Sequence, residues 1–171
     1  NRRDARSAAE LAPRLSDAAA QVAGAAAAAL GKIGVPALAP LTAALAGAPA
    51  PLRAVVADAC LLCADALLAQ GKRDDAAALY DRGRAADGPA PVRIAATRGA
   101  VLARPAGALP LVVEQLQSRE PGRVALALFL VRELPGGEAT KRIADELARL
   151  AAERQLLLLA ALADRRDAAA V

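Results

Sequence analysis

The chain alternates between apolar-periodic segments and short turns rich in proline and glycine. Each segment is long enough for several helical turns, and the punctuating turns fall near positions 31–36, 47–51, 88–91, 104–107, 121–122 and 135–137. Apolar residues three or four apart over such lengths are typical of helices, and Pro and Gly mark helix ends. The pattern therefore predicts ten helices in five pairs. The first helices of the pairs are expected over 4–14, 36–46, 73–86, 107–118 and 138–149, and the second over 17–31, 51–70, 90–103, 121–134 and 152–164.

The composition strengthens the helical prediction. Of the 171 residues, 51 are alanine and 56% are hydrophobic, while the chain has one Phe, one Tyr, no Trp and few Ile or Thr. Ala, Leu and Arg are strong helix formers, and the residues that favour strands are scarce. The fold class predicted from the sequence is all-α.

The second helices resemble one another, which indicates a repeat. Each has a branched apolar residue near its start, and these landmarks are Val22, Leu52, Val92, Val124 and Leu156. The last two steps between landmarks are equal, and the step that spans the long second helix is the largest. A periodic helix pair of this size is the signature of an α-solenoid, in which stacked pairs bury faces that a single pair cannot. We therefore expect one solenoid domain over residues 1–171, with close helix approaches at Ala26, Ala59, Ala96 and Ala127.

Helix-end signals agree with these segments. Polar N-caps, prolines in first turns and glycine C-caps each have a physical preference for their position. The expected N-caps are Asp17 and Asp87, the first-turn prolines are Pro51, Pro91 and Pro121, and the C-caps are Gly31, Gly34 and Gly71.

Two stretches have a more specific pattern. The first consists of Asp17, Val22, Ala26, Leu30, Ile33 and Gly34, and the second of Asp87, Val92, Arg93, Ala95 and Ala96. On these residues the chain resembles the HEAT-repeat family. The resemblance implies a right-handed α-α superhelix of about five helical pairs, which binds a protein or peptide on a concave face lined by the second helices. The family's Asp–Arg pair is complete only at Asp87 and Arg93, and Arg53 retains the arginine alone.

Residues 71–89 differ from the rest of the repeat. Gly71, Ala76, Tyr80 and Pro89 resemble the second helix of a tetratricopeptide repeat. Both families are helical-pair solenoids, so the resemblance implies one such unit inside a HEAT-like array.

The residue inventory argues against catalysis. The chain has no histidine, so the commonest general base and zinc ligand are missing. Adjacent carboxylates occur at Asp74–Asp75 and at Asp145–Glu146, but both pairs are expected on solvated faces of amphipathic helices. We predict no catalytic residue, no cofactor site and no metal site, and we interpret the chain as a non-enzyme.

Cys60 and Cys63 form a C-x-x-C pattern on one helix face. A redox motif of this kind needs a βαβ context, and a metal site needs two more ligands. We therefore expect both thiols to be reduced, mostly buried and free of metal, as small apolar members of a helix core.

The charge is distributed evenly along the chain. The formal net charge is +4, with equal shares in the two halves, and aromatic residues make up 1%. Nucleic-acid binders usually concentrate basic side chains on one face and stack bases on aromatic rings. We expect only weak nucleic-acid binding. The alternative is a DNA-binding module or a HEAT-like enzyme resembling DNA glycosylases or phycobilin lyases, which would use Arg93, Arg98, Arg123 and Arg132.

No membrane span is expected, because the longest uncharged apolar stretch, residues 22–31, is shorter than the roughly 20 residues needed. The chain is predicted to be soluble, and its first residue, Asn1, suggests a piece of a longer protein.

The most informative segments are residues 124–131 and 156–163, which contain no polar side chain. A surface helix normally has an apolar stripe rather than an apolar circumference. Either these helices are buried on all sides, or they form a groove for a partner or for self-association. The candidate partner-binding residues are Arg93, Arg98, Leu126, Phe129, Leu130, Arg132, Leu157 and Leu158. The sequence does not identify the partner beyond a protein or peptide.

Overall fold

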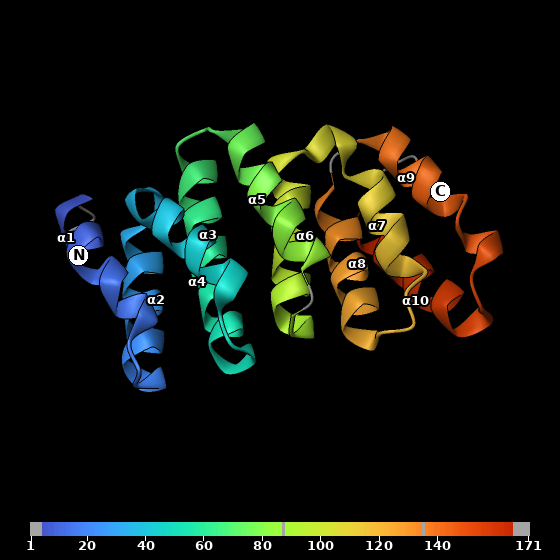
Figure 1. The fold of residues 1–171 in the computed structure, drawn as a ribbon. Coiled ribbons are helices and arrows are strands. Elements are labelled where there is room, and N and C mark those ends of the chain that lie inside the picture. The colour runs from blue at the N-terminus through green and yellow to red at the C-terminus, as the bar shows by residue number, and fades with distance from the viewer. Residues whose placement is uncertain (1–4, 87, 135, 166–171) are drawn as a thin grey trace. The chain divides into compact units, whose positions relative to one another are not determined.

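The computed structural model of the chain describes residues 5–86, 88–134 and 136–165. These residues contain ten α-helices and no strand (Figure 1), so the all-α prediction is confirmed. The helices are α1 (Ala5–Leu11), α2 (Ala20–Ile33), α3 (Leu38–Gly47), α4 (Ala50–Ala69), α5 (Arg73–Ala85), α6 (Ala90–Ala103), α7 (Leu109–Leu116), α8 (Pro121–Glu133), α9 (Gly137–Ala144) and α10 (Ala152–Asp164).

Three of the predicted first helices, α1, α7 and α9, are each four residues shorter than expected. Helix α1 ends at Leu11 and continues as a 3-10 turn over Ala12–Ser16, and α9 is followed by a 3-10 turn over Leu147–Arg149. The first break coincides with Pro13, which has no N–H to donate to the preceding turn.

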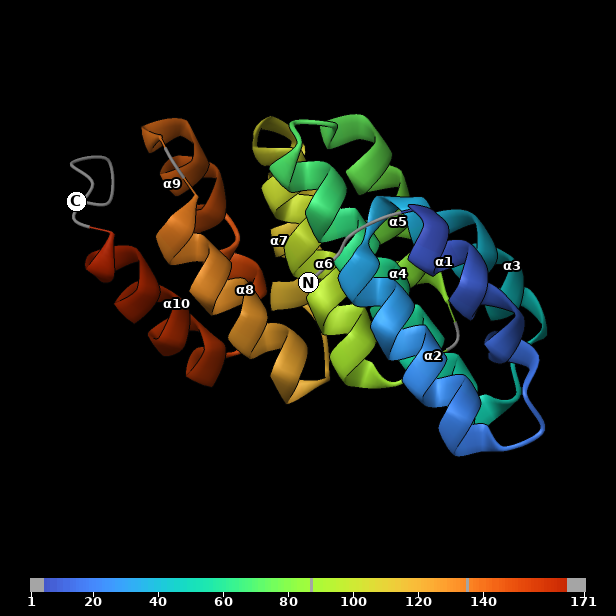
Figure 2. The ribbon, with the colours of Figure 1, turned by 90° about the vertical axis from the view of Figure 1, so that its left-hand side faces the viewer.

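The contacts divide the chain into two compact units, Asn1–Ala103 (unit 1) and Arg104–Val171 (unit 2). In unit 1, α2 packs on α4, and α4 packs on α5 and α6. In unit 2, α8 packs on α7 and on α10, and α9 packs on α10. Figure 2 shows α8 and α10 side by side. Each helix therefore packs chiefly on helices near it in the sequence.

The five second helices begin with the same pair of backbone hydrogen bonds. In each, one carbonyl accepts from the N–H groups three and four positions later. We call the residue with that carbonyl the start residue. The start residues are Ala19, Pro49, Pro89, Glu120 and Ala151.

This register places side chains consistently. The residues seven positions after the start are all buried, namely Ala26, Val56, Ala96, Ala127 and Leu158. The residues nine positions after the start are all exposed, namely Ala28, Asp58, Arg98, Phe129 and Ala160. Two positions correspond to about 200° around a helix, so each second helix has one packed side and one free face. Three of the four small residues predicted at close approaches, Ala26, Ala96 and Ala127, occupy the packed position, and Ala59 is buried as well.

The register corrects the landmarks chosen from the sequence. Val22, Leu52 and Val92 lie three positions after their start residues, but Val124 lies four after Glu120, and Leu156 lies five after Ala151. The structurally equivalent residues are Arg123 and Arg154. A shift of one position rotates a side chain by about 100°, so the landmarks chosen from the sequence misalign the last two helices.

Polar side chains satisfy carbonyl groups just before three of the second helices. Arg53 donates to the Ala48 carbonyl at 3.0 Å, and Arg93 donates to the Gly88 carbonyl at 2.5 Å. Gln155 donates to the Leu150 carbonyl at 2.9 Å, again five positions earlier. The arginines noted in the HEAT resemblance thus stabilise the turns that lead into α4 and α6.

The helix-end predictions are partly confirmed. Pro51, Pro91 and Pro121 lie in first turns, and Gly34 and Gly71 follow helices with φ of 85° and 77°. The prediction for Gly31 is wrong, because this residue is buried inside α2. The prediction for Asp17 is also wrong, because Ala19 precedes α2 and Asp17 accepts a hydrogen bond from the Ala19 N–H at 3.0 Å. Asp87 lies outside the described residues.

Candidate functional site

An apolar surface lies on the free faces of α8 and α10 in unit 2. We call it the α8–α10 face, and it consists of Ala125, Phe129, Arg132, Leu157, Ala160 and Asp164. The three residues on each helix are three or four apart, so they form one stripe per helix. Phe129 is 46% exposed and Leu157 is 51% exposed. Arg132 joins the two stripes through an ion pair with Asp164, with Nε 2.7 Å from Oδ2.

The structure separates the predicted partner-binding residues into an exposed group and a buried group, and Arg93 is half-buried between them. Arg98, Phe129, Arg132 and Leu157 are exposed, in agreement with the prediction that they face outward. The outward orientation predicted for Leu126, Leu130 and Leu158 is wrong, because these side chains are 8%, 1% and 0% exposed. Ala161 of α10 is also buried.

The physical reason lies in the packing of helices α8 and α10. Leu158 is seven positions after the start of its helix and Leu130 is ten positions after the start of its own, and the other second helices bury or partly bury those positions. Because these helices are apolar all round, the sequence does not distinguish their buried side from their exposed side. The structure therefore selects neither alternative in full, since each helix is buried on one side and exposed on the other.

The arginines predicted as candidates mostly have structural partners. Arg93 donates to the Gly88 carbonyl, and Arg132 donates to Asp164 and to the Leu128 carbonyl. Arg123 donates to Gln115 at 2.6 Å and to Glu114 at 2.7 Å. The DNA-binding alternative would use four arginines. In three of them, Arg93, Arg123 and Arg132, the guanidinium group donates hydrogen bonds to the protein itself.

Other arginines bridge sequence-distant helix ends. Arg73 donates to the Leu102 carbonyl, Arg154 to the Leu116 carbonyl and Arg165 to the Val131 carbonyl. The last carbonyl groups of a helix have no partner within it, and a cation there also interacts favourably with the helix dipole. Part of the arginine content is therefore explained by a structural role, in which arginines donate hydrogen bonds to carbonyl groups near helix C-termini.

Sequence reasoning missed several exposed apolar side chains. In unit 1 they are Val22, Val55, Leu62 and Leu102, and in unit 2 they are Leu156 and Leu159. The signal that could have found Leu62 and Leu102 is the structural register. Both lie thirteen positions after their start residues, where all five second helices are exposed.

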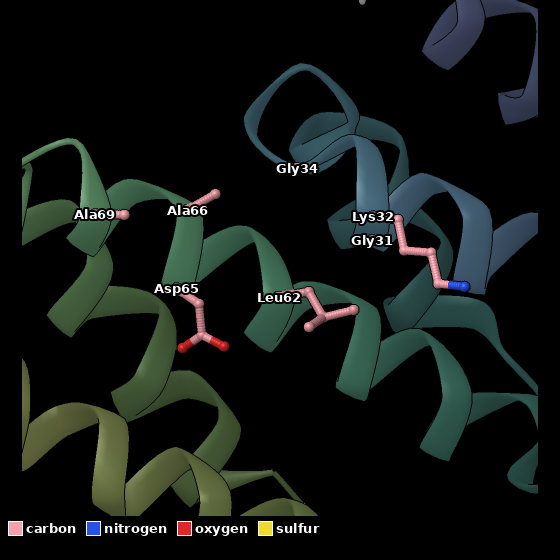
Figure 3. A pocket seen from close by; sticks show the side chains of 7 residues that line it. All are labelled: Gly31, Lys32, Gly34, Leu62, Asp65, Ala66 and Ala69. Atoms are coloured by element: carbon pink, nitrogen blue, oxygen red, sulfur yellow. The ribbon is translucent and has the colours of Figure 1, made fainter. Parts of the chain in front are cut away.

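A hollow of about 290 Å³ lies between α2 and α4 on unit 1. Figure 3 shows Leu62 of α4 directed toward α2, with Lys32 on α2 and Asp65 on α4 to either side. Asp65 accepts a hydrogen bond from the Tyr80 hydroxyl at 2.5 Å. Burial raises the pKa of Tyr80 above its ordinary value, and the Asp65 carboxylate adds to the increase. The phenol is thus held in its neutral, donating form, and the Asp65–Tyr80 contact ties α4 to α5.

The paired carboxylates have different environments. Asp74 and Asp75 are exposed in the first turn of α5, as predicted. Glu146, in contrast, is only 7% exposed, and it accepts hydrogen bonds from Gln117 at 3.1 Å and from Arg149 at 2.5 Å. The expected solvated face is therefore wrong for Glu146, which links the end of α7 to the turn after α9.

Both cysteines lie in α4 and are buried, at 7% exposure for Cys60 and 0% for Cys63, so their predicted burial is confirmed. The Cys63 thiol donates to the Gly34 carbonyl at 3.2 Å. Burial raises the pKa of Cys60 to about 11 and that of Cys63 to about 12, and in Cys63 the neighbouring Cys60 adds to the increase. Within residues 5–86, 88–134 and 136–165, no three His, Cys, Asp or Glu side chains are grouped as a metal site requires.

We predict that neither thiol reacts with Ellman's reagent in the folded protein at pH 8. The thiolate is the reactive form, and a raised pKa lowers its fraction by about a hundredfold or more. Because the folded pKa values lie above the ordinary value of 9.0, the stabilisation by neutral thiols is complete below pH 9 and is lost as the pH rises through 11 to 12. Two thiols per chain should react once urea unfolds the protein. Reaction of either thiol before unfolding, at the rate of free cysteine, would contradict this prediction.

No protein-family model and no curated protein matches the sequence. None of the helices in the described part of the chain is both long enough and apolar enough to span a membrane.

Proposed function

We propose that this chain is a HEAT-type α-solenoid that serves as a non-catalytic scaffold and binds a protein or peptide on the free faces of its second helices. The observation that supports the proposal most directly is the α8–α10 face, where Phe129 and Leu157 expose about half of their surface. Aromatic and large aliphatic side chains in the centre of a surface, with charges at its rim, are typical of binding sites for proteins.

The repeated register supports the solenoid part of the proposal. Five second helices share the same starting hydrogen bonds, the same buried position and the same exposed position. Stacked helical pairs leave one extended face free, and such faces are used for binding in repeat proteins.

The chemistry of the face favours a peptide with an apolar stripe. Arg132 and Asp164 neutralise each other at one end of the face, and Glu153 lies near its other end. An amphipathic helix or short apolar segment could bury Phe129 and Leu157 without leaving a charge unpaired. The arginine contacts described above make phosphate-rich partners a poorer fit.

A peptide library tests the proposal. Peptides displayed on phage are selected on the immobilised chain, and the affinities of the selected peptides are measured by calorimetry. We expect Phe129→Asp and Leu157→Asp each to weaken binding at least about tenfold, because each places a charge in the apolar centre of the face.

Leu159→Asp is the matched control. Leu159 is 50% exposed, close to the 51% of Leu157, and lies two positions further along α10, on a different flank. This variant should bind the selected peptides with unchanged affinity. Equal loss in the Leu157 and Leu159 variants, or no loss at Phe129 and Leu157, would refute the α8–α10 face as the binding site.

A further inference from the structure

Two hollows of unit 1 occupy equivalent places, each between the N-terminal parts of successive second helices. One lies between α2 and α4 and measures about 500 Å³, and the other lies between α4 and α6 and measures about 420 Å³. In both, the lining includes positions one and four of the first helix, counted from its start residue, and positions zero and three of the next. These residues are Ala20, Ala23, Pro49 and Leu52 in one hollow, and Ala50, Arg53, Pro89 and Val92 in the other.

The two hollows differ most at position four of the first helix. We name them after that residue, the Ala23 hollow and the Arg53 hollow. Both are separate from the hollow beside Lys32, which is lined by the C-terminal parts of α2 and α4. The repeat therefore places a hollow at each of these two junctions, and the side chains at equivalent positions determine what each can bind.

The Arg53 hollow has apolar walls. They are formed by Leu45 of α3, Ala54 and Ala57 of α4 and Val92 of α6. Gly83 of α5 also lines the hollow, and a Cβ atom there would lie 3.0 Å from the Ala96 Cβ and 3.1 Å from the Leu61 Cδ2. Helix α5 thus packs closely against α4 and α6 at this point and closes one side of the hollow. Small-molecule sites in proteins have volumes of about 300–1,000 Å³ and are mostly apolar, with a few polar groups.

Arg53 is the only charged side chain among the described residues that line this hollow. Its Nε and Nη2 donate to the Ala48 carbonyl at 3.2 and 3.0 Å, which fixes the guanidinium at the N-terminal end of α4, close to Ala50 of the lining. No carboxylate in the described part of the chain pairs with Arg53. Nη1 is therefore available to donate to a ligand, and a carboxylate is the group that a guanidinium binds best in this way.

The Ala23 hollow has the opposite electrostatic character. The described residues of its lining include no basic side chain, and Asp17 contributes a carboxylate. An anion would be repelled by Asp17 and would find no guanidinium at position four. The same apolar hollow is thus present twice, and only the second has a cation beside it.

We propose that the Arg53 hollow binds a small aliphatic carboxylate, with the aliphatic chain between α4 and α6 and the carboxylate on the Arg53 guanidinium. The walls are aliphatic, and one guanidinium with one nitrogen available matches a ligand with a single negative charge. The proposal goes beyond the proposed function, because the site lies in unit 1 and takes a small molecule, whereas the α8–α10 face lies in unit 2 and takes a peptide.

The affinity is expected to be modest. The ligand is small and the Arg53 side chain is exposed, so dissociation constants of about 0.1–1 mM are expected for a medium-chain fatty acid. A hydrogen bond to an exposed charged group contributes a factor of about three to ten to such a constant.

Titration of the isotope-labelled chain with octanoate, followed by amide NMR spectra at neutral pH, tests the proposal. Octanoate should shift the amide signals of Ala54, Gly83 and Val92 with saturation, and the signals of Ala20 and Ala44 in the Ala23 hollow should not change. Octanol has the same chain without the charge. It should bind at the same place about three- to tenfold more weakly.

Arg53→Gln removes the charge and keeps the turn. Gln155 occupies the same position of α10 and donates to the Leu150 carbonyl at 2.9 Å, so a glutamine at residue 53 can replace the hydrogen bond to Ala48. The variant should bind octanoate as weakly as octanol, with its affinity for octanol unchanged. Lys32→Gln is the matched control, because it removes the same charge from an exposed site outside the Arg53 hollow, and it should bind both ligands like the wild type.

Ala54→Leu tests the apolar part of the site. A leucine here fills the hollow, so both ligands should bind at least about tenfold more weakly. Ala54 is half-buried in α4 and leucine is a good helix former, so the circular dichroism should not change. Ala28→Leu adds the same side chain on the exposed face of α2 and should leave both affinities unchanged.

Three results would overturn the proposal. They are octanoate shifts that do not saturate in the millimolar range, equal affinities of the wild type for octanoate and octanol, and undiminished octanoate binding by Ala54→Leu. An equal loss of both ligands in Arg53→Gln would also contradict it, since the charge would then have no role of its own. None of these variants alters the α8–α10 face, so failure of this proposal and failure of the proposed function are distinguishable.

Discussion

Leu158→Asp is expected to unfold unit 2, whereas the same substitution at the adjacent Leu157 leaves it folded. Leu158 is 0% exposed, and Leu157 is 51% exposed. Removing a buried leucine costs about 2–5 kcal/mol, and an uncompensated carboxylate in the same place adds to that cost. The total is comparable to the whole stability of a domain of this size. At Leu157 the carboxylate remains in water, so the cost is limited to the lower helix propensity of aspartate, about 0.5 kcal/mol.

Urea unfolding followed by far-ultraviolet circular dichroism distinguishes the two variants. Leu158→Asp should lose a large part of the helical signal before urea is added, and unit 1 should give the remaining transition. Leu157→Asp should match the wild type within about 1 kcal/mol. If both variants are unfolded, or if both are as stable as the wild type, the assignment of Leu158 to the packed side of α10 is contradicted.

The sequence was sufficient to locate the helices, because their ends are defined by local chemistry. Pro51 fits only the first turn of α4, and Gly71 adopts a φ of 77° just after α4 ends. Between these residues the chain consists of helix formers, so the predicted range of 51–70 agrees closely with Ala50–Ala69. Signals of this kind depend on a few neighbouring residues and need no knowledge of the packing.

The orientation of α8 and α10 could not be predicted in the same way. In an ordinary amphipathic helix, polar residues identify the side that faces water. Residues 124–131 and 156–163 have no polar side chain, so the pattern gives no direction. The alignment between repeats could have supplied it, but the steps from Val92 to Val124 and from Val124 to Leu156 are each one position longer than the structural steps between the start residues of these helices. Leu158 and Leu130 were placed on the wrong side for this reason.

The arginine contacts were also beyond the sequence. Arg73 lies 29 residues before Leu102, whose carbonyl it contacts, and Arg165 lies 34 residues after Val131. An arginine near a helix end can equally well face solvent, a partner or another helix. Only the packing of the helices within each unit decides among these environments, so the partners of the individual arginines could not be predicted from the sequence.

Gly99→Ala is expected to destabilise unit 1 by about 2–3 kcal/mol, although alanine is the better helix former. A Cβ atom at residue 99 would lie 2.2 Å from Cε1 and 2.4 Å from Cδ1 of Tyr80. The Tyr80 ring is 1% exposed, and its hydroxyl is held by Asp65, so the ring cannot move away without losing both packing and the hydrogen bond.

Gly24→Ala is the matched control for this substitution. Gly24 also lies inside a helix of unit 1, but a Cβ atom there would have no neighbour within 4 Å. This variant should be more stable than the wild type by about 0.5–1 kcal/mol, which is the ordinary gain for replacing a helical glycine. Destabilisation in both variants, or in neither, would contradict the close contact between α5 and α6.

The ionisation of Tyr80 provides a second test of the Gly99→Ala variant. A change in helix propensity alone would not alter the pKa of Tyr80, whereas displacement of its ring would. Tyr80 is the only tyrosine and the chain has no tryptophan, so the absorbance of phenolate near 295 nm reports this residue alone. In the wild type, burial and Asp65 hold the pKa of Tyr80 above its ordinary value of about 10. The stabilisation associated with the neutral phenol is complete below that ordinary pKa and is lost as the pH rises through the folded pKa. At pH 10.5 the wild type and Gly24→Ala should therefore remain largely protonated. In Gly99→Ala the displaced ring should titrate at lower pH than in the wild type, because a phenol forced out of its site loses the burial that keeps it neutral.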